Sequence, residues 1–152
     1  MVNDLATAAP RTAAVDVANR LRPVLLQLNR QLRRETREVG ISGGQASLLH
    51  LIHQNPGVGV GELAQRERIS APGMVGHVDR LEAAGLVART RSETDRRRVG
   101  LTATDEGRRL LKAVRRRRTA WLAERLKSLD GADLEALDRA IEPLGRLLED
   151  DE

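Results

Sequence analysis

The chain has 152 residues, of which 40% are hydrophobic, 32% are charged and 1% are aromatic, and it contains no cysteine. This composition excludes disulfides, thiolate metal sites and thiol redox chemistry, and the length suits one domain with an extension for self-association. A core of Leu, Val, Ile and Ala favours helices packed on helices over an all-β sandwich. No hydrophobic run approaches the about 18 residues of a membrane helix, and the first residues lack the pattern of a secretion signal. We therefore expect a cytoplasmic protein with no membrane partner.

The charged residues are distributed unevenly along the chain. The formal net charge is +4, from 26 basic and 22 acidic residues, and almost all of the basic residues are arginine. Residues 60–118 hold 15 basic and 8 acidic residues, whereas the rest of the chain carries a net negative charge. A basic segment with acidic flanks favours a polyanionic partner for the middle of the chain. A solvated, arginine-rich surface would give the same counts.

The N-terminal part of the chain predicts one long helix. Residues 1–12 show no hydrophobic period and predict a flexible arm. Residues 13–40 carry hydrophobic side chains three and four positions apart, which predicts an amphipathic helix that Pro23 kinks. The stretch Ser42–Gln45 has the form of a capping box and predicts the start of a second helix. This second helix is expected to end at the Asn-Pro-Gly sequence of residues 55–57.

The middle of the chain has the pattern of two short helices followed by a hairpin. A short helix is predicted over about residues 60–67, and Ser70 is the expected N-cap of the next helix, which ends near Gly85. Residues 86–91 and 99–103 predict two strands joined by a polar turn. A helix-turn-helix followed by a hairpin is a winged helix, in which the second helix reads DNA and the hairpin forms the wing.

Two further helices complete the predicted organisation. Thr104 is the expected N-cap of a long helix, and Asp130 is that of a last helix, which Pro143 bends. The long terminal helices exceed what a small winged helix needs to cover its core, so their hydrophobic faces predict a homodimer. The expected fold is mainly α with a small β-hairpin wing. The expected segments are a flexible arm (1–12), an N-terminal dimerisation helix (13–40), a winged helix-turn-helix DNA-binding region (41–103), C-terminal dimerisation helices (104–148) and an acidic tail (149–152).

Four short motifs follow one another at characteristic spacings. They are ISGGQASLL at 41–49, GELA at 61–64, VDRLEAAGLV at 78–87, and DRR at 95–97 followed by TDEG at 104–107. In this order the chain resembles the MarR family of bacterial transcription regulators over about residues 17–148. The resemblance implies a dimer that places each recognition helix in a major groove of a pseudo-palindromic DNA site and each wing in a minor groove. Many members of that family are repressors that small aromatic acids or phenols release from DNA.

The candidate DNA-binding residues lie on the recognition helix and in the hairpin. The resemblance assigns Arg97 to the minor groove, oriented by Asp95, and an ordinary surface ion pair is the alternative. The remaining arginines of the hairpin are candidate phosphate contacts or solvated charges. The full set is Ser70, Ala71, Gly73, Val75, Gly76, Arg80, Arg89, Arg91, Asp95, Arg96, Arg97 and Arg98.

The recognition helix lacks most of the long polar side chains that pair with bases. Residues 71–76 contain Ala, Pro, Gly, Met and Val, whereas bidentate contacts to guanine or adenine need Arg, Lys, Asn or Gln. Either specificity comes from the wing and from DNA shape, or base reading is weak. Two alternatives to a sequence-specific repressor therefore stay open: a low-specificity architectural DNA binder, and a helical dimer that binds a protein or a small molecule without reading an operator.

Two histidines are the candidate effector contacts. His50 and His53 are three residues apart, and hence on one face of the second helix, which lines the effector pocket in the family that the chain resembles. Packed polar side chains are the alternative, and no third metal ligand lies nearby. The four arginines of residues 115–118 cover all faces of a helix, so most of them are expected to be solvated or paired between subunits. No phosphate-binding loop is present, and neither an enzyme nor a cofactor is expected.

Overall fold

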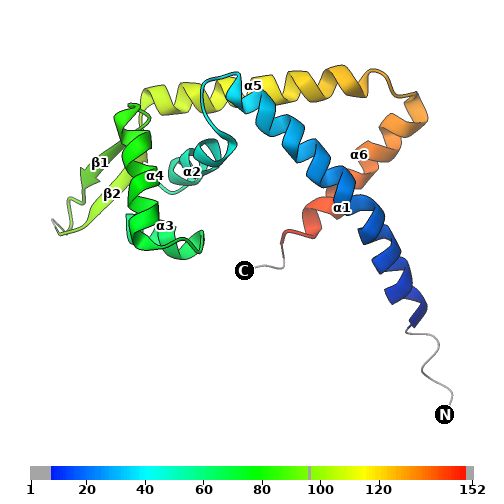
Figure 1. Ribbon diagram of the computed structural model, residues 1–152, viewed down its shortest axis with the longest axis horizontal. Helices are drawn as coiled ribbons and strands as arrows, with labels where there is room; N and C mark the ends of the chain where they lie inside the picture. Colours follow the sequence, from blue (N-terminus) through cyan, green and yellow to red (C-terminus); the bar gives the residue numbers. More distant parts are fainter. Residues whose placement is uncertain (1–7, 96, 150–152) are drawn as a thin grey trace, which may run out of the picture.

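The computed structural model describes residues 8–95 and 97–149. Within them, one antiparallel hairpin projects from one end of an otherwise helical structure, and the order of elements is that of the predicted winged helix flanked by long helices (Figure 1). The elements are α1 (Ala8–Arg37), α2 (Gly43–Gln54), α3 (Val60–Arg66), α4 (Ala71–Ala83), β1 (Val87–Arg91), β2 (Val99–Ala103), α5 (Asp105–Leu126) and α6 (Gly131–Arg146). The predicted fold class is confirmed.

Side chains cap four of the helices at the positions that the sequence predicts. The Ser42 hydroxyl accepts the Gln45 backbone N–H, and the Gln45 side chain accepts the Ser42 N–H, which completes a capping box. At the starts of α4, α5 and α6, the side chains of Ser70, Thr104 and Asp130 each accept one backbone N–H. Each cap satisfies a backbone donor that the helix itself leaves without a partner, and this fixes where the helix starts.

The core lies between α2, α3, α4 and the hairpin. Leu49, Ile52, Leu63, Met74 and Leu101 are fully buried in it. Residues 74, 78 and 81 of α4 all face this core, so the opposite side of α4 is left for solvent or a ligand. The core therefore determines which face of the predicted recognition helix is available.

The hairpin is held to the core by a short third stretch that the sequence patterns did not predict. Strands β1 and β2 pair from Val87 opposite Ala103 to the end at the turn. The Leu101 N–H donates to the Val58 carbonyl at 2.8 Å, and the Gly57 N–H donates to the Leu101 carbonyl at 2.8 Å. A single bridge is too short to show a strand period, which explains why it escaped prediction.

The long helices leave wide hydrophobic surfaces uncovered in the single chain. Helix α5 packs on α1 and α2, and α6 turns back from its far end (Figure 1). Helix α6 buries none of its residues, and Leu134, Leu137 and Ile141 are 45%, 49% and 67% exposed. On α1, Val17 and Val24 are more than half exposed. Uncovered hydrophobic surface of this extent marks an interaction site.

The N-terminal boundary differs from the prediction. Helix α1 starts at Ala8, so residues 8–12 are helical rather than part of a flexible arm, while residues 1–7 lie outside the described part of the chain. The alanines of this stretch are good helix formers even without a hydrophobic period, which is why periodicity alone placed the start too late. The helix continues through Pro23. Among the described residues, no helix combines the length and the hydrophobicity that crossing a membrane requires.

Candidate DNA-binding surface

The outward side of α4 carries the predicted recognition residues. Ser70, Ala71, Val75 and Arg80 are exposed, and Gly73 and Gly76 are partly buried. The Ser70 hydroxyl accepts the Gly73 N–H at 3.2 Å, so its oxygen is engaged as the N-cap. The exposed start of a helix also offers free backbone N–H groups, which suit a phosphate. Apart from Arg80, the side chains on this face are short and mostly apolar, as the sequence predicts.

A Cβ at Gly73 would meet atoms that one at Gly76 would not. At Gly73 it would lie 3.0 Å from the Ser70 hydroxyl and 3.2 Å from a methyl group of Ile69, so the glycine keeps the cap compact. At Gly76 it would meet no atom within 4 Å. The absence of a side chain at Gly76 therefore has no packing reason inside the chain, and it leaves the helix backbone accessible.

Arg89 ties the hairpin to the recognition helix. Its Nε donates to the Glu82 carboxylate at 2.7 Å, and its Nη2 donates to the Asp79 carboxylate at 2.6 Å. Arg89 was predicted as a candidate phosphate contact, but both acidic partners come from α4 and β1 provides the arginine. A guanidinium that joins two carboxylates fixes the strand relative to the helix. The Arg80 side chain, by contrast, is exposed, and its Nη1 atom lies 3.4 Å from the Nδ1 atom of His77.

The wing turn is organised by Ser92 and Asp95. The Ser92 hydroxyl accepts the backbone N–H groups of Thr94 and Asp95, each at 3.3 Å, and the Asp95 carbonyl accepts the Arg98 N–H at 2.9 Å. The Asp95 carboxylate accepts the Arg97 backbone N–H at 3.1 Å. The expected side-chain pair between Asp95 and Arg97 is not formed: the carboxylate holds the backbone of Arg97 because the residues are only two apart in a tight turn.

Three arginines of the hairpin are exposed and have no acidic partner. Within residues 8–95 and 97–149, the side chains of Arg91, Arg97 and Arg98 form no ion pair. Arg96 lies outside the described residues. Unpaired guanidinium groups at the tip of a projecting hairpin are suited to bidentate contact with phosphate or to a narrow minor groove.

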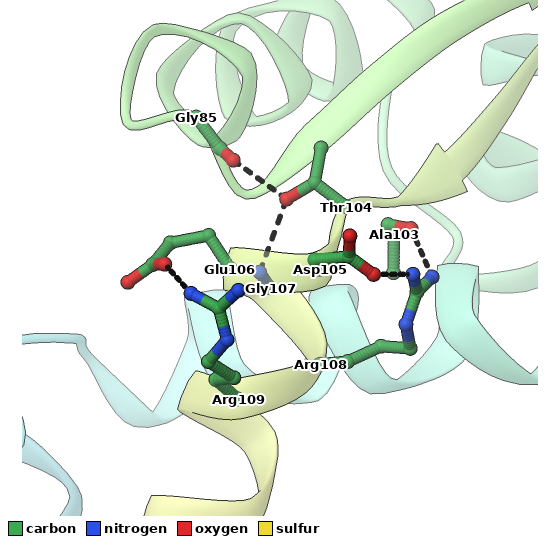
Figure 2. Close-up of polar contacts among 8 residues, drawn as sticks. All are labelled: Gly85, Ala103, Thr104, Asp105, Glu106, Gly107, Arg108 and Arg109. Carbon is green, nitrogen blue, oxygen red and sulfur yellow. Dashed lines mark hydrogen bonds and ion pairs between the residues drawn. The ribbon is translucent and has the colours of Figure 1, made fainter.

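The base of the hairpin is joined to α5 through Thr104 (Figure 2). The Thr104 hydroxyl donates to the Gly85 carbonyl at 2.6 Å and accepts the Gly107 N–H at 3.0 Å, and the Thr104 N–H donates to the Leu86 carbonyl at 3.0 Å. The Arg108 side chain donates to the Ala103 carbonyl and to the Asp105 carboxylate. The end of α4, the end of β2 and the start of α5 thus form one rigid joint.

A cavity of about 580 Å³ lies between α2 and α5 and includes both predicted effector residues. His50 and His53 are exposed side chains at its α2 wall. Lys112, Arg115 and Arg118 line its α5 wall, and the sequence patterns did not predict that any of the three lies in an effector pocket. They recur three residues apart, so the periodicity of the helix could have placed them on one face.

The arginine run of residues 115–118 makes contacts within the chain. Arg117 pairs with Glu35 of α1 at 2.9 Å, and the Arg118 Nε donates to the buried Thr36 hydroxyl at 2.9 Å. These two side chains therefore have partners within their own chain. Burial lowers the pKa of Arg118, and the nearby charge of Arg33 lowers it further.

Comparison with known proteins gives the family. A family model described as MarR family matches residues 39–98. An HTH-type transcriptional regulator of Mycobacterium tuberculosis is 32% identical over 134 residues, covering 88% of this chain and 94% of the relative. A putative transcriptional regulator of Pseudomonas aeruginosa has a similar structure, with a TM-score of 0.75, 30% identity and coverage of 92% and 98% of the two chains.

Two of the similar structures were solved with DNA, those of a Staphylococcus aureus MepR mutant and of FabT. Streptococcus pneumoniae FabT in complex with DNA matches with a TM-score of 0.66 and 21% identity over 88% of this chain and 99% of that chain, a likeness of fold. The mycobacterial relative supplies the sequence relationship, since the match extends over nearly the whole length of both proteins. Together with the matching family model, it shows that this chain belongs to the MarR family, a family of transcription regulators rather than enzymes.

Proposed function

We propose that the protein is a homodimeric repressor that binds a pseudo-palindromic DNA operator. The observation that carries this proposal is the group of unpaired arginines on the wing, Arg91, Arg97 and Arg98, beside the exposed face of α4. The structural neighbour FabT, which has the same fold, was solved in complex with DNA. A dimer bound across a promoter would exclude polymerase, which is the simplest route to repression.

A symmetric pair of identical chains would match the two half-sites of a palindromic DNA site. The uncovered hydrophobic faces of α1 and α6 support a second copy as the partner, because a hydrophobic helical face of this length is costly to leave in water. A symmetric dimer would present two α4 helices and two wings to successive turns of DNA. We expect this dimer to reside in the cytoplasm, where its DNA is.

The candidate DNA contacts divide into two groups. We assign Arg97 to the minor groove, with Arg91 and Arg98 on flanking phosphates, and Ser70 and Arg80 on the phosphates beside α4. Ala71, Gly73, Val75 and Gly76 would lie against base edges, where they offer only apolar contact or close backbone approach. Arg96 would add a further phosphate contact. Arg89 is not assigned to DNA, because its guanidinium already pairs with two carboxylates of α4 and so positions the hairpin.

A low-specificity DNA binder is the second candidate. The apolar outer face of α4 favours it, since the side chains of Ala71 and Val75 cannot donate a hydrogen bond to a base. A binder of this kind would depend on phosphate contacts and would show similar affinity for any duplex.

The proposed repressor would also be regulated by a small molecule. A cavity between α2 and α5 supports this, because a ligand held there would contact both the DNA-reading module and a long helix.

A competition assay separates the candidates. The labelled DNA is the region upstream of the protein's own coding sequence, and random duplex of equal length competes at two salt concentrations. A preference of about a thousandfold or more supports the specific repressor. Equal and salt-sensitive binding of both duplexes supports the low-specificity binder, and no binding at low salt rejects both and leaves a helical dimer without a DNA function.

A further inference from the structure

The cavity between α2 and α5 has a strongly one-sided charge. Its α5 wall presents Arg108, Lys112, Arg115 and Arg118, and its α2 wall presents His50 and His53. None of the described residues that line it is acidic. The four basic side chains come from one face of α5, because they are spaced by four and three residues. Like charges at this spacing repel one another, so an anion that enters the cavity would reduce the repulsion among these four side chains.

The cations of this row are not equally available. Arg108 donates to the Ala103 carbonyl at 2.8 Å and pairs with Asp105, and Arg118 donates to Thr36. In the described part of the chain, the side chains of Lys112 and Arg115 form no hydrogen bond and no ion pair. Two free cations therefore line a cavity that is large enough, at about 580 Å³, for a small organic molecule.

The rest of the lining limits the kind of ligand further. Ala46, Leu111 and Val114 supply aliphatic surface, and no Phe, Tyr or Trp lines the cavity among the described residues. Stacking on a phenyl, phenol or indole ring is therefore not available to a ligand here. The two histidines can donate hydrogen bonds to oxygen atoms from the opposite wall. The chemistry suits oxygen-rich anions rather than aromatic ones.

We infer that this cavity binds a small non-aromatic anion with two or more negative charges, held chiefly by Lys112 and Arg115. Its charged groups are phosphates or carboxylates, since both accept hydrogen bonds from ammonium and guanidinium groups. The inference deepens the effector part of the proposed function, because the ligand would bridge α2 of the DNA-reading module and α5 of the long-helix scaffold.

Calorimetric titration of the full-length protein without DNA tests the inference. Inorganic pyrophosphate, citrate and benzoate are titrated at one fixed ionic strength. We expect pyrophosphate or citrate to bind at least about tenfold more tightly than benzoate, and the stronger of the two identifies phosphate or carboxylate as the preferred group. Lys112→Ala and Arg115→Ala should each weaken that binding by about tenfold, since each removes a charged hydrogen bond.

Arg116→Ala is the matched control. It removes the same charge one residue along α5, from a side chain that does not line the cavity, and should leave the affinity within about twofold of the unmodified protein, because charges at a distance are screened. The inference is overturned if neither pyrophosphate nor citrate binds better than benzoate, or if Arg116→Ala weakens binding as much as Arg115→Ala. Since no DNA is present, this failure would leave the proposed operator binding intact, and that binding is measured separately.

Discussion

Replacing Gly107 with alanine tests whether the joint at the base of the wing is as tight as its geometry indicates. A Cβ at residue 107 would lie 2.2 Å from the Leu86 carbonyl oxygen and 3.3 Å from a methyl carbon of Leu49, whereas ordinary contact begins at 3.4 Å. The nearest atom belongs to the backbone, so no rotamer change can relieve the clash. That same oxygen accepts the Thr104 N–H at 3.0 Å, which holds it in place.

The expected cost can be worked out from these contacts. Overpacking a rigid site costs about 1–3 kcal/mol, and moving the Leu86 carbonyl weakens a hydrogen bond worth about 1 kcal/mol. The intrinsic helix preference of alanine returns up to about 1 kcal/mol. We expect Gly107→Ala to lower the free energy of unfolding by about 1–3 kcal/mol, measured by urea denaturation. DNA affinity should fall as well, because the joint sets the position of the hairpin.

Gly76→Ala is the control for this measurement. Residue 76 is also a helical glycine, but its added Cβ would meet no atom within 4 Å. Alanine there should raise the free energy of unfolding by up to about 1 kcal/mol. If Gly107→Ala is as stable as the unmodified protein, or if it raises stability as Gly76→Ala is expected to, the contact between α5 and Leu86 is looser than described and the reasoning fails.

The remaining predictions concern the wing, its attachment and the dimer. Arg97→Ala should lower DNA affinity by about tenfold, measured by fluorescence anisotropy, with unchanged unfolding; an equal loss in Arg139→Ala, on α6, would refute a specific wing contact. Arg89→Ala should lower the free energy of unfolding by less than about 1 kcal/mol, since its ion pairs are partly exposed, yet reduce DNA affinity severalfold; unchanged affinity would mean that the wing needs no tie to α4. Leu137→Asp should convert a dimer to monomers in sedimentation, because it places a charge in the proposed hydrophobic interface; a persisting dimer would locate that interface elsewhere.

Local sequence determined most of the elements of this protein and the starting residues of four of its helices. The caps at Ser42, Ser70, Thr104 and Asp130 were predictable because each depends on residues within four positions of the cap. The inward face of α4 followed from helical spacing alone. The start of α1 was missed for the opposite reason, since its first turns are polar or alanine-rich and show no period.

The partners of the charged residues were decided only by tertiary structure. Arg89 pairs with acids seven and ten residues away, and Arg117 and Arg118 reach α1 across 82 positions in the chain. No local pattern predicts such pairs, because they depend on how α1, α5 and the hairpin pack. The same packing placed Lys112 and Arg115 opposite His50 and His53. Sequence thus determined which residues are basic and which helix they occupy, while the fold decided which of them are neutralised and which remain free to bind.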